Sequence, residues 1–205
     1  VYRMYSYFYK EFKEIIETSN INFADAAVKA ICVANWDLNG NGELSEIEAM
    51  SVTDLGEVFK SNQDIISLDE LQFFTGLTNI GEEAFSRCYN LKSIVIPNSV
   101  VTLADGAFSN CTGLESLELP NSITYIGKEL LNGCTGIISL TIPSNVKTIG
   151  TKIISGCSNL ATLSVDDANE LYDSRNNCNA IIETETNTLI CGCMNTIIPS
   201  SVEQI

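Results

Sequence analysis

Oxygen-bearing side chains alternate along one short stretch of the chain, which ends in a glutamate. Asp37, Asn39 and Asn41 stand two residues apart, and Gly42 follows them where a sharp turn is needed. Hard oxygen donors at this spacing are the ligands that Ca²⁺ prefers, because this cation takes about six to eight oxygens. The stretch therefore predicts a calcium site whose ligands are Asp37, Asn39, Asn41, the backbone carbonyl of Glu43, Ser45 (directly or through water) and both carboxylate oxygens of Glu48.

The twelve residues 37–48 resemble the calcium loop of an EF-hand at every defining position. The resemblance implies a helix on each side, and the sequence is compatible with one over residues 23–36, capped by Asn22, and one over residues 46–51. Leu44 stands where an EF-hand has the apolar residue that pairs with a partner loop. Few full charges surround the ion, so we expect a dissociation constant on the order of 10⁻⁴ M or tighter. The alternatives are an acidic turn that binds nothing and a Mg²⁺ site.

A degenerate partner loop is predicted over residues 59–71. Aligning Ile66 with Leu44 places Glu70 at the last loop position, but the first position then falls on Phe59, which cannot bind a cation. We therefore expect a metal-free half-site whose short strand pairs with the first loop.

A repeat of 23 residues fills the stretch 80–165, where four copies begin at Ile80, Leu103, Ile126 and Ile149. Such a unit cannot bury its own apolar face and must stack on its neighbours, so the sequence predicts a solenoid. Apolar residues recur at the same offsets in each copy and are predicted to point inward; in the first copy they are Ile80, Phe85, Cys88, Leu91, Ile94, Ile96 and Val100.

Each copy contains one predicted strand of the form L-x-x-I-x-I, and stacked copies would pair these strands into a parallel sheet. The strands cover residues 91–96, 114–119, 137–142 and 160–165, and prolines follow the first three. The pattern C-x-x-L-x-x-I-x-I-P-x-S-V, followed by I-G-x-x-A-F, resembles the BspA-like leucine-rich repeat of bacterial surface proteins over roughly the last 125 residues. The resemblance implies a secreted or cell-surface bacterial protein that adheres to host or neighbouring cells, through a protein partner or host surface component.

The predicted fold class is α+β, with three parts. Residues 1–20 form an amphipathic helix, residues 21–76 an EF-hand-like cap, and residues 77–205 the leucine-rich repeats with an inserted hairpin near 180–191. An end cap is needed because a solenoid exposes an apolar cross-section at each end. The hairpin is either a working surface or a decorative loop. The chain begins at Val1 and stops where a further copy would start, so we expect it to be part of a longer polypeptide.

The net charge of −15 sits on both sides of the repeats. Residues 21–79 carry ten acids and two bases, residues 166–205 carry seven and one, and residues 80–165 carry six and five. This distribution argues against binding to nucleic acid or to an anionic membrane, which needs clustered Lys and Arg. No apolar run reaches the length of a membrane span, and no signal sequence is visible. We expect a monomer.

One cysteine recurs in each copy, at Cys88, Cys111, Cys134 and Cys157, and these four are predicted to stack as buried apolar residues. The irregular Cys178, Cys191 and Cys193 leave room for one disulfide. Without histidine or a C-x-x-C pair, a zinc site is not expected.

The chain also lacks the usual general base, because it contains no histidine, and no inward-facing pair of carboxylates recurs. We therefore predict a non-enzymatic interaction module. The outward strand positions form a small polar surface without aromatic rings, which favours a protein partner over a sugar; they are Ser93, Val95, Ser116, Glu118, Ser139, Thr141, Thr162 and Ser164. The alternatives are a calcium-responsive switch and a structural spacer in a longer surface protein.

Overall fold

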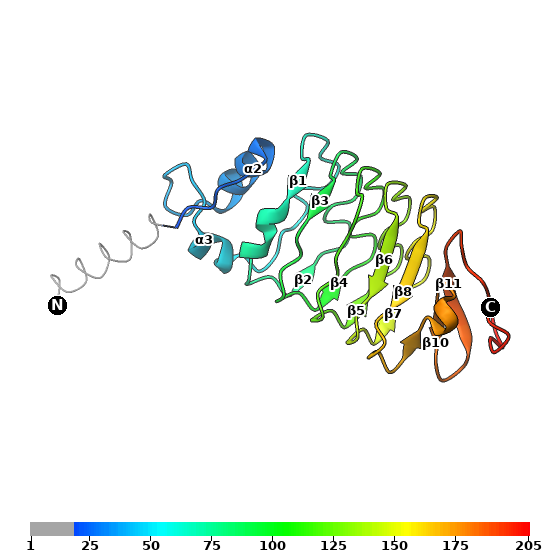
Figure 1. Ribbon diagram of the computed structural model, residues 1–205. Helices are drawn as coiled ribbons and strands as arrows, with labels where there is room; N and C mark the ends of the chain where they lie inside the picture. Colours follow the sequence, from blue (N-terminus) through cyan, green and yellow to red (C-terminus); the bar gives the residue numbers. More distant parts are fainter. Residues whose placement is uncertain (1–18) are drawn as a thin grey trace, which may run out of the picture.

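The computed structural model describes residues 19–205, so nearly all of the predicted helix over residues 1–20 lies outside the described part. Stacked turns of chain form an elongated array, with two helices at one end and a hairpin at the other (Figure 1). The elements are α2 (Ala26–Trp36), α3 (Glu46–Ser51), β1 (Ser67–Leu68), the 3₁₀ helix η1 (Asp69–Phe73), β2 (Asn79–Ile80), β3 (Ser93–Ile94), β4 (Thr102–Leu103), β5 (Tyr125–Ile126), β6 (Ser139–Ile142), β7 (Thr148–Ile149), β8 (Thr162–Val165), β9 (Tyr172–Asp173), η2 (Arg175–Asn177), β10 (Ala180–Glu183) and β11 (Thr188–Gly192).

Two rows of short parallel strands run along the array. The first row is a four-stranded sheet in the order β2-β4-β5-β7, in which Ile80, Leu103, Ile126 and Ile149 stand side by side. The sequence pattern did not predict this row. It uses the apolar residue that opens each copy, so the 23-residue repeat sets its register.

The second row contains the predicted L-x-x-I-x-I strands, but it is interrupted. β1 pairs with β3 and β6 pairs with β8, whereas residues 114–119 form no strand, so the prediction of a continuous sheet is wrong there. Glu115 still donates a long hydrogen bond of 3.4 Å to the carbonyl of Lys92. Leu117 is buried all the same. Burial of apolar side chains therefore holds this segment in place, although Glu115 provides its only backbone hydrogen bond to a neighbouring turn among the described residues.

The core confirms the predicted inward positions. All seven named residues of the first copy are at most 6% exposed. Phe85 stacks on Phe108 with ring centroids 5.3 Å apart, and Phe59 stacks on Phe85 at the same distance. Trp36, at the end of α2, packs against Phe59 and Phe74 with centroids 6.1 and 5.4 Å away. One aromatic stack thus joins the helices to the repeats.

The cysteine ladder is confirmed, with Cys88, Cys111 and Cys134 buried and Cys157 half-buried, and each thiol also has a hydrogen-bond acceptor. In every copy the Sγ atom donates to the carbonyl of the aromatic or apolar residue one turn back, at 2.9–3.1 Å; the pairs are Cys88–Phe59, Cys111–Phe85, Cys134–Phe108 and Cys157–Leu131. Burial raises the pKa of Cys88 to about 11 and that of Cys157 to about 12. All eight cysteines are free, including Cys178, Cys191 and Cys193, so the disulfide considered there does not form in this structure.

The predicted pairing of residues 59–71 with the calcium loop is wrong. Ser67 and Leu68 form β1, which pairs with β3 in the second row of strands. The loop instead pairs with the preceding chain, since Ser45 bridges Asn20. The sequence of residues 59–71 is ambiguous, because its apolar positions fit a repeat turn as well as a half-site. Phe59 makes the same thiol contact that Phe85 and Phe108 make in later turns.

The hairpin predicted near residues 180–191 is confirmed by β10 and β11, which pair antiparallel. β9 joins them to complete a three-stranded sheet at the end of the array (Figure 1). Ile181 is fully buried in the main core, whereas Ala180 and Ile182 form a smaller cluster with Cys178, Leu189 and Val202. The hairpin therefore covers the last repeat.

Candidate functional site

The predicted calcium loop connects α2 to α3. α2 begins at Ala26 rather than near Phe23, because the carboxylate of Asp25, and not the side chain of Asn22, caps its free amides. Asp25 Oδ1 accepts hydrogen bonds from Ala27 (2.9 Å) and Val28 (3.4 Å). α3 has the bounds that the sequence predicted, and Ser45 is its N-cap.

The loop folds around the carboxylate of Asp37. Its Oδ2 accepts a hydrogen bond from the amide of Gly42 (2.8 Å), and its Oδ1 accepts from Gly40 (2.7 Å) and Asn41 (3.3 Å). These bonds, with that from Gly42 the largest contribution, hold the pKa of Asp37 below its ordinary value. Gly42 has φ = 81°, a left-handed conformation that suits glycine. The first predicted ligand is therefore ionised at neutral pH.

The two asparagines follow the same local pattern. Asn39 Oδ1 accepts from the amide of Asn41 (2.9 Å), and Asn41 Oδ1 accepts from the amide of Glu43 (2.8 Å). The carboxylate of Glu43 forms an ion pair with Lys29 of α2 at 2.7 Å. The predicted cation ligand at this position is the backbone carbonyl of Glu43. The ion pair uses the side-chain carboxylate and does not involve that carbonyl.

Glu48 is buried, and its two oxygens accept four hydrogen bonds. Oε1 accepts from the amides of Leu38 (3.0 Å) and Asn39 (3.2 Å), and Oε2 accepts from the amide (2.9 Å) and the hydroxyl (2.8 Å) of Ser45. Ser45 Oγ in turn accepts from the Glu48 amide at 3.2 Å, which completes a capping box. A carboxylate has about four lone-pair sites, so a cation bound by both oxygens would have to replace some of these donors.

The donor chemistry of the loop fits Ca²⁺. Every predicted ligand atom is an oxygen, and five of the six residues place those atoms within one loop between two helix ends. Within residues 19–205, no group of three or more His, Cys, Asp or Glu side chains is suited to hold a metal ion. Only two of the predicted ligands, Asp37 and Glu48, are carboxylates. The other predicted ligand oxygens belong to two side-chain amides, a hydroxyl and a backbone carbonyl.

Two carboxylates fasten the helices to the first turn of the array. Asp25 Oδ2 accepts from the amides of Ile66 (2.6 Å) and Ser67 (3.3 Å), at the start of β1. In the opposite direction, Glu70 Oε1 accepts from the amide of Ala24 at 2.8 Å. Burial alone would raise the pKa of Asp25, but the hydrogen bonds from Ile66 and the other amides lower it overall. The predicted calcium loop is thus one helix away from a direct attachment to the repeats.

The second row of strands presents a surface that we call the strand face, formed by the outward residues of β1, β3, residues 114–119, β6 and β8. The predicted outward positions are exposed or half-buried, as expected. Two hollows lie on this face. The first has a volume of about 540 Å³ and the second about 380 Å³, and Ser116, Glu118 and Leu119 line both. No aromatic side chain lines either of them.

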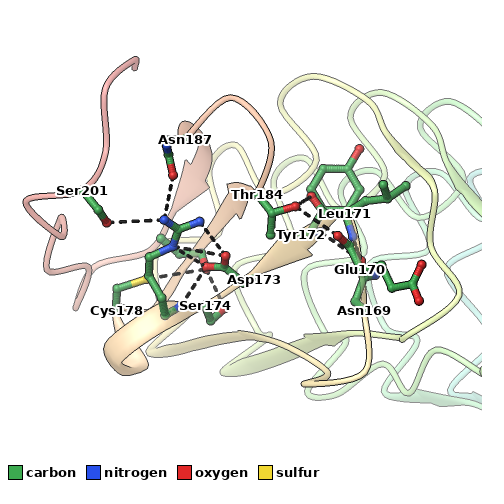
Figure 2. A network of polar contacts seen from close by, with 12 residues as sticks. Asn169, Glu170, Leu171, Tyr172, Asp173, Ser174, Cys178, Thr184, Asn187 and Ser201 are labelled. Carbon is green, nitrogen blue, oxygen red and sulfur yellow. Dashed lines mark hydrogen bonds and ion pairs between the residues drawn. The ribbon is translucent and has the colours of Figure 1, made fainter.

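A network of polar contacts holds the hairpin in place (Figure 2). Arg175 makes a bidentate contact with Asp173, at 2.6 Å for the closest pair of atoms. It also donates to Asn187 Oδ1 at the hairpin turn (2.8 Å) and to Ser201 Oγ (3.4 Å). These bonds tie the turn to the last residues of the chain, so the hairpin is a fixed cover.

Comparison with known sequence families assigns the array. The profile of the BspA type leucine rich repeat region, which spans six copies, matches residues 57–180. The chain belongs to this BspA-type leucine-rich repeat family. The matched region begins at residue 57, so it includes the turn that contains β1. No curated protein matches the chain.

Several solved bacterial structures are similar to parts of this leucine-rich repeat chain. A leucine-rich repeat protein from Eubacterium ventriosum is 25% identical, with a TM-score of 0.51 over 62% of this chain and 40% of that one. One from Bacteroides ovatus is 32% identical, with a TM-score of 0.42 over 50% and 29%. The protein TpLRR of T. pallidum is 24% identical, with a TM-score of 0.41 over 48% and 50%. The chain thus aligns with at most half the length of each of these proteins.

Two features of the structure could not be predicted from the sequence. The carboxylates of Asp25 and Glu70 attach the helices to the repeats, but their partners are backbone amides about 40 residues away, which no local pattern reveals. Two hollows adjoin residues 116–119, and this stretch does not pair although its sequence matches that of the paired copies. Within residues 19–205, no helix is long and apolar enough to cross a membrane.

Proposed function

We propose that this chain is a non-enzymatic interaction module of a secreted or cell-surface bacterial protein, which adheres to host or neighbouring cells through a protein partner. The observation that carries the proposal is the strand face, a polar surface with two adjoining hollows on a rigid repeat array. Leucine-rich repeat arrays offer extended surfaces of this kind to other proteins. Membership of the BspA-type family supports the location.

We further propose that one Ca²⁺ stabilises the helical unit, which we define as residues 19–52. Asp37, Asn39, Asn41, the carbonyl of Glu43 and Glu48 would hold the ion, and Ser45 would act directly or through water. The bound ion would supply positive charge that neutralises two carboxylates and fixes the loop. Asp37 is ionised at neutral pH, as a ligand of Ca²⁺ must be.

The attachment to the array gives calcium a structural purpose. Trp36 directly precedes the first ligand, Asp37, and its ring packs on Phe59 and Phe74 of the first turn. A loop fixed by an ion would hold the end of α2, and thereby this aromatic contact, in place. The helical unit then serves as the N-terminal cap that a solenoid needs.

Adhesion is tested with beads that carry the 205-residue chain, applied to cultured epithelial cells and to bacterial cells in calcium-containing buffer. We expect the beads to be retained more than beads that carry an unrelated protein of similar size and net charge. If the two kinds of bead are retained equally on every cell type, the adhesion function is contradicted and a structural spacer is favoured.

A calcium-responsive switch is the second candidate. The observation that favours it is the set of four donors on Glu48, since ligation of both oxygens would require some of them to move. A switch exposes an apolar surface when calcium binds. A rise in the fluorescence of an apolar dye on addition of calcium would support the switch, and unchanged fluorescence would support the structural role.

A further inference from the structure

The two hollows of the strand face form one continuous path across the strands. The first hollow reaches from Asp69, just after β1, to Glu118, and the second from Glu118 to Asp166, just after β8. Neighbouring parallel strands lie about 4.8 Å apart, so four steps from β1 to β8 span about 19 Å. An extended peptide of about six residues has this length.

The charges along this path have one sign. Asp69, Glu118 and Asp166 line the hollows, and no lysine or arginine does. Within residues 19–205, the side chains of Asp69 and Glu118 take part in no hydrogen bond or ion pair, and Glu118 is exposed. Both carboxylates are therefore available to a cationic partner without breaking an internal contact.

Two of these carboxylates come from turns that lie two apart in the array and line the same hollow. Leu68 pairs with Ile94, Asp69 directly follows this pair at the start of η1, and Glu118 follows Val95 by one 23-residue period. The rings of Phe85 and Phe108 in successive turns stack 5.3 Å apart, so positions two turns apart in the array are separated by about 10 Å. A polyproline II peptide has three residues per turn and rises about 3.1 Å per residue, so every third side chain points the same way at about 9 Å.

The path crosses the interruption in the second row of strands. Residues 116–119 make no backbone hydrogen bond to β3 or β6 among the described residues, although the copies on both sides are paired. The backbone groups of this segment thus have no backbone partner among the described residues. The two hollows meet at this segment, with Glu118 between them.

We propose that the strand face binds an extended, basic segment of a protein partner, whose arginine or lysine side chains recur at every third residue. Glu118 is the central anchor, Asp69 binds the next cationic side chain, and the unpaired segment at residues 116–119 accepts additional hydrogen bonds. The proposal rests on the proposed function, since it names the class of partner that the interaction surface takes.

The test is fluorescence anisotropy with a labelled nonapeptide that has arginine at every third position and proline and serine between. We expect saturable binding that weakens as salt is raised, and about five-fold weaker binding to Glu118→Gln, the loss that one exposed ion pair gives. Asp69→Asn should weaken binding to a similar degree. The matched control is Glu82→Gln, which removes an equal charge from an exposed glutamate at a different hollow.

Two results would overturn the inference. One is equal weakening by Glu118→Gln and Glu82→Gln, and the other is equal affinity for a peptide whose three arginines are adjacent; either would show simple attraction to the net charge. Unchanged melting temperatures of the variants verify that the fold is intact. If the beads adhere to cells but the peptide does not bind, this inference fails and the proposed function stands. If the peptide binds as expected but the beads do not adhere, the peptide-binding inference stands and the proposed adhesion function fails.

Discussion

Replacement of Glu48 by glutamine separates two roles of this carboxylate. Without calcium, Glu48 accepts four hydrogen bonds in a buried position, and the amide of glutamine would direct its two N–H groups at donors on one side. At least two of the four bonds are then lost. We expect a cost of about 3 kcal/mol, because each bond to a charged acceptor contributes about 1.5–3 kcal/mol before relaxation. For a chain of this size the melting temperature should fall by about 6–12 °C.

Calcium should stabilise the wild-type chain but not Glu48→Gln. At about 10 mM calcium, or about 100 times the expected dissociation constant, linkage predicts about 2.7 kcal/mol of stabilisation. This corresponds to a rise of about 5–11 °C in the melting temperature. The assay is differential scanning calorimetry in calcium and in excess chelator. The matched control is Glu46→Gln, which removes an exposed carboxylate from the same helix and should retain the full shift with calcium.

The reasoning would be refuted in either of two ways. If calcium stabilises Glu48→Gln as much as the wild type, the ion binds elsewhere. If calcium leaves the wild-type melting temperature unchanged, the loop does not bind it under these conditions. A loss of stability for Glu48→Gln in chelator, without any effect of calcium, would show that this residue serves only the capping box.

Four further predictions concern Asp25 and the buried cysteines. Asp25→Asn should uncouple the helical unit from the array, so that the fluorescence of Trp36, the only tryptophan, changes at a lower temperature than the far-UV circular dichroism; a single shared transition would contradict this. In the wild type, the lowered pKa of Asp25 predicts a contribution that is present above its ordinary value of 3.8 and lost as the pH falls below it, which an acid titration of Trp36 fluorescence follows. Cys111→Ala should cost about 2 kcal/mol in urea unfolding, because the carbonyl of Phe85 loses its buried donor and a small cavity remains, whereas Cys111→Ser should cost less; equal losses would exclude a contribution from the hydrogen bond. The raised pKa of Cys88, about 11, also predicts that stability decreases as the pH rises above 9.0, the ordinary thiol value, which urea unfolding at successive pH values measures.

Periodicity was sufficient to predict the array but not its pairing. The 23-residue repeat identified the buried side chains, because burial depends on residue type and offset, which the sequence states directly. It could not show that residues 114–119 would stay unpaired, since Leu114 and Leu117 match the apolar positions of the paired copies. Backbone hydrogen bonding depends on small shifts between neighbouring turns, and such shifts do not change the spacing of apolar residues in the sequence.

The loop illustrates the same division. The spacing of Asp37, Asn39 and Asn41 predicted a compact turn, and the structure has one, with each side chain accepting a hydrogen bond from a nearby amide. The predicted partner of the loop is wrong, because the resemblance to an EF-hand suggested that a second loop downstream pairs with it. The residues that take this place, Asn20 and Ile21, lie upstream in a stretch with no recognisable motif.

The equal spacing of contacts also bears on how such a chain can change in length over evolution. Within the copies, each thiol reaches a carbonyl 26 residues back, so loss or gain of 23 residues rejoins surfaces that already match. A deletion of any other size would place polar residues in the core. Cys88, however, reaches 29 residues back to Phe59, three more than in the later copies. Recombination can therefore exchange the inner copies freely, whereas the first turn is inherited together with the helices that it carries.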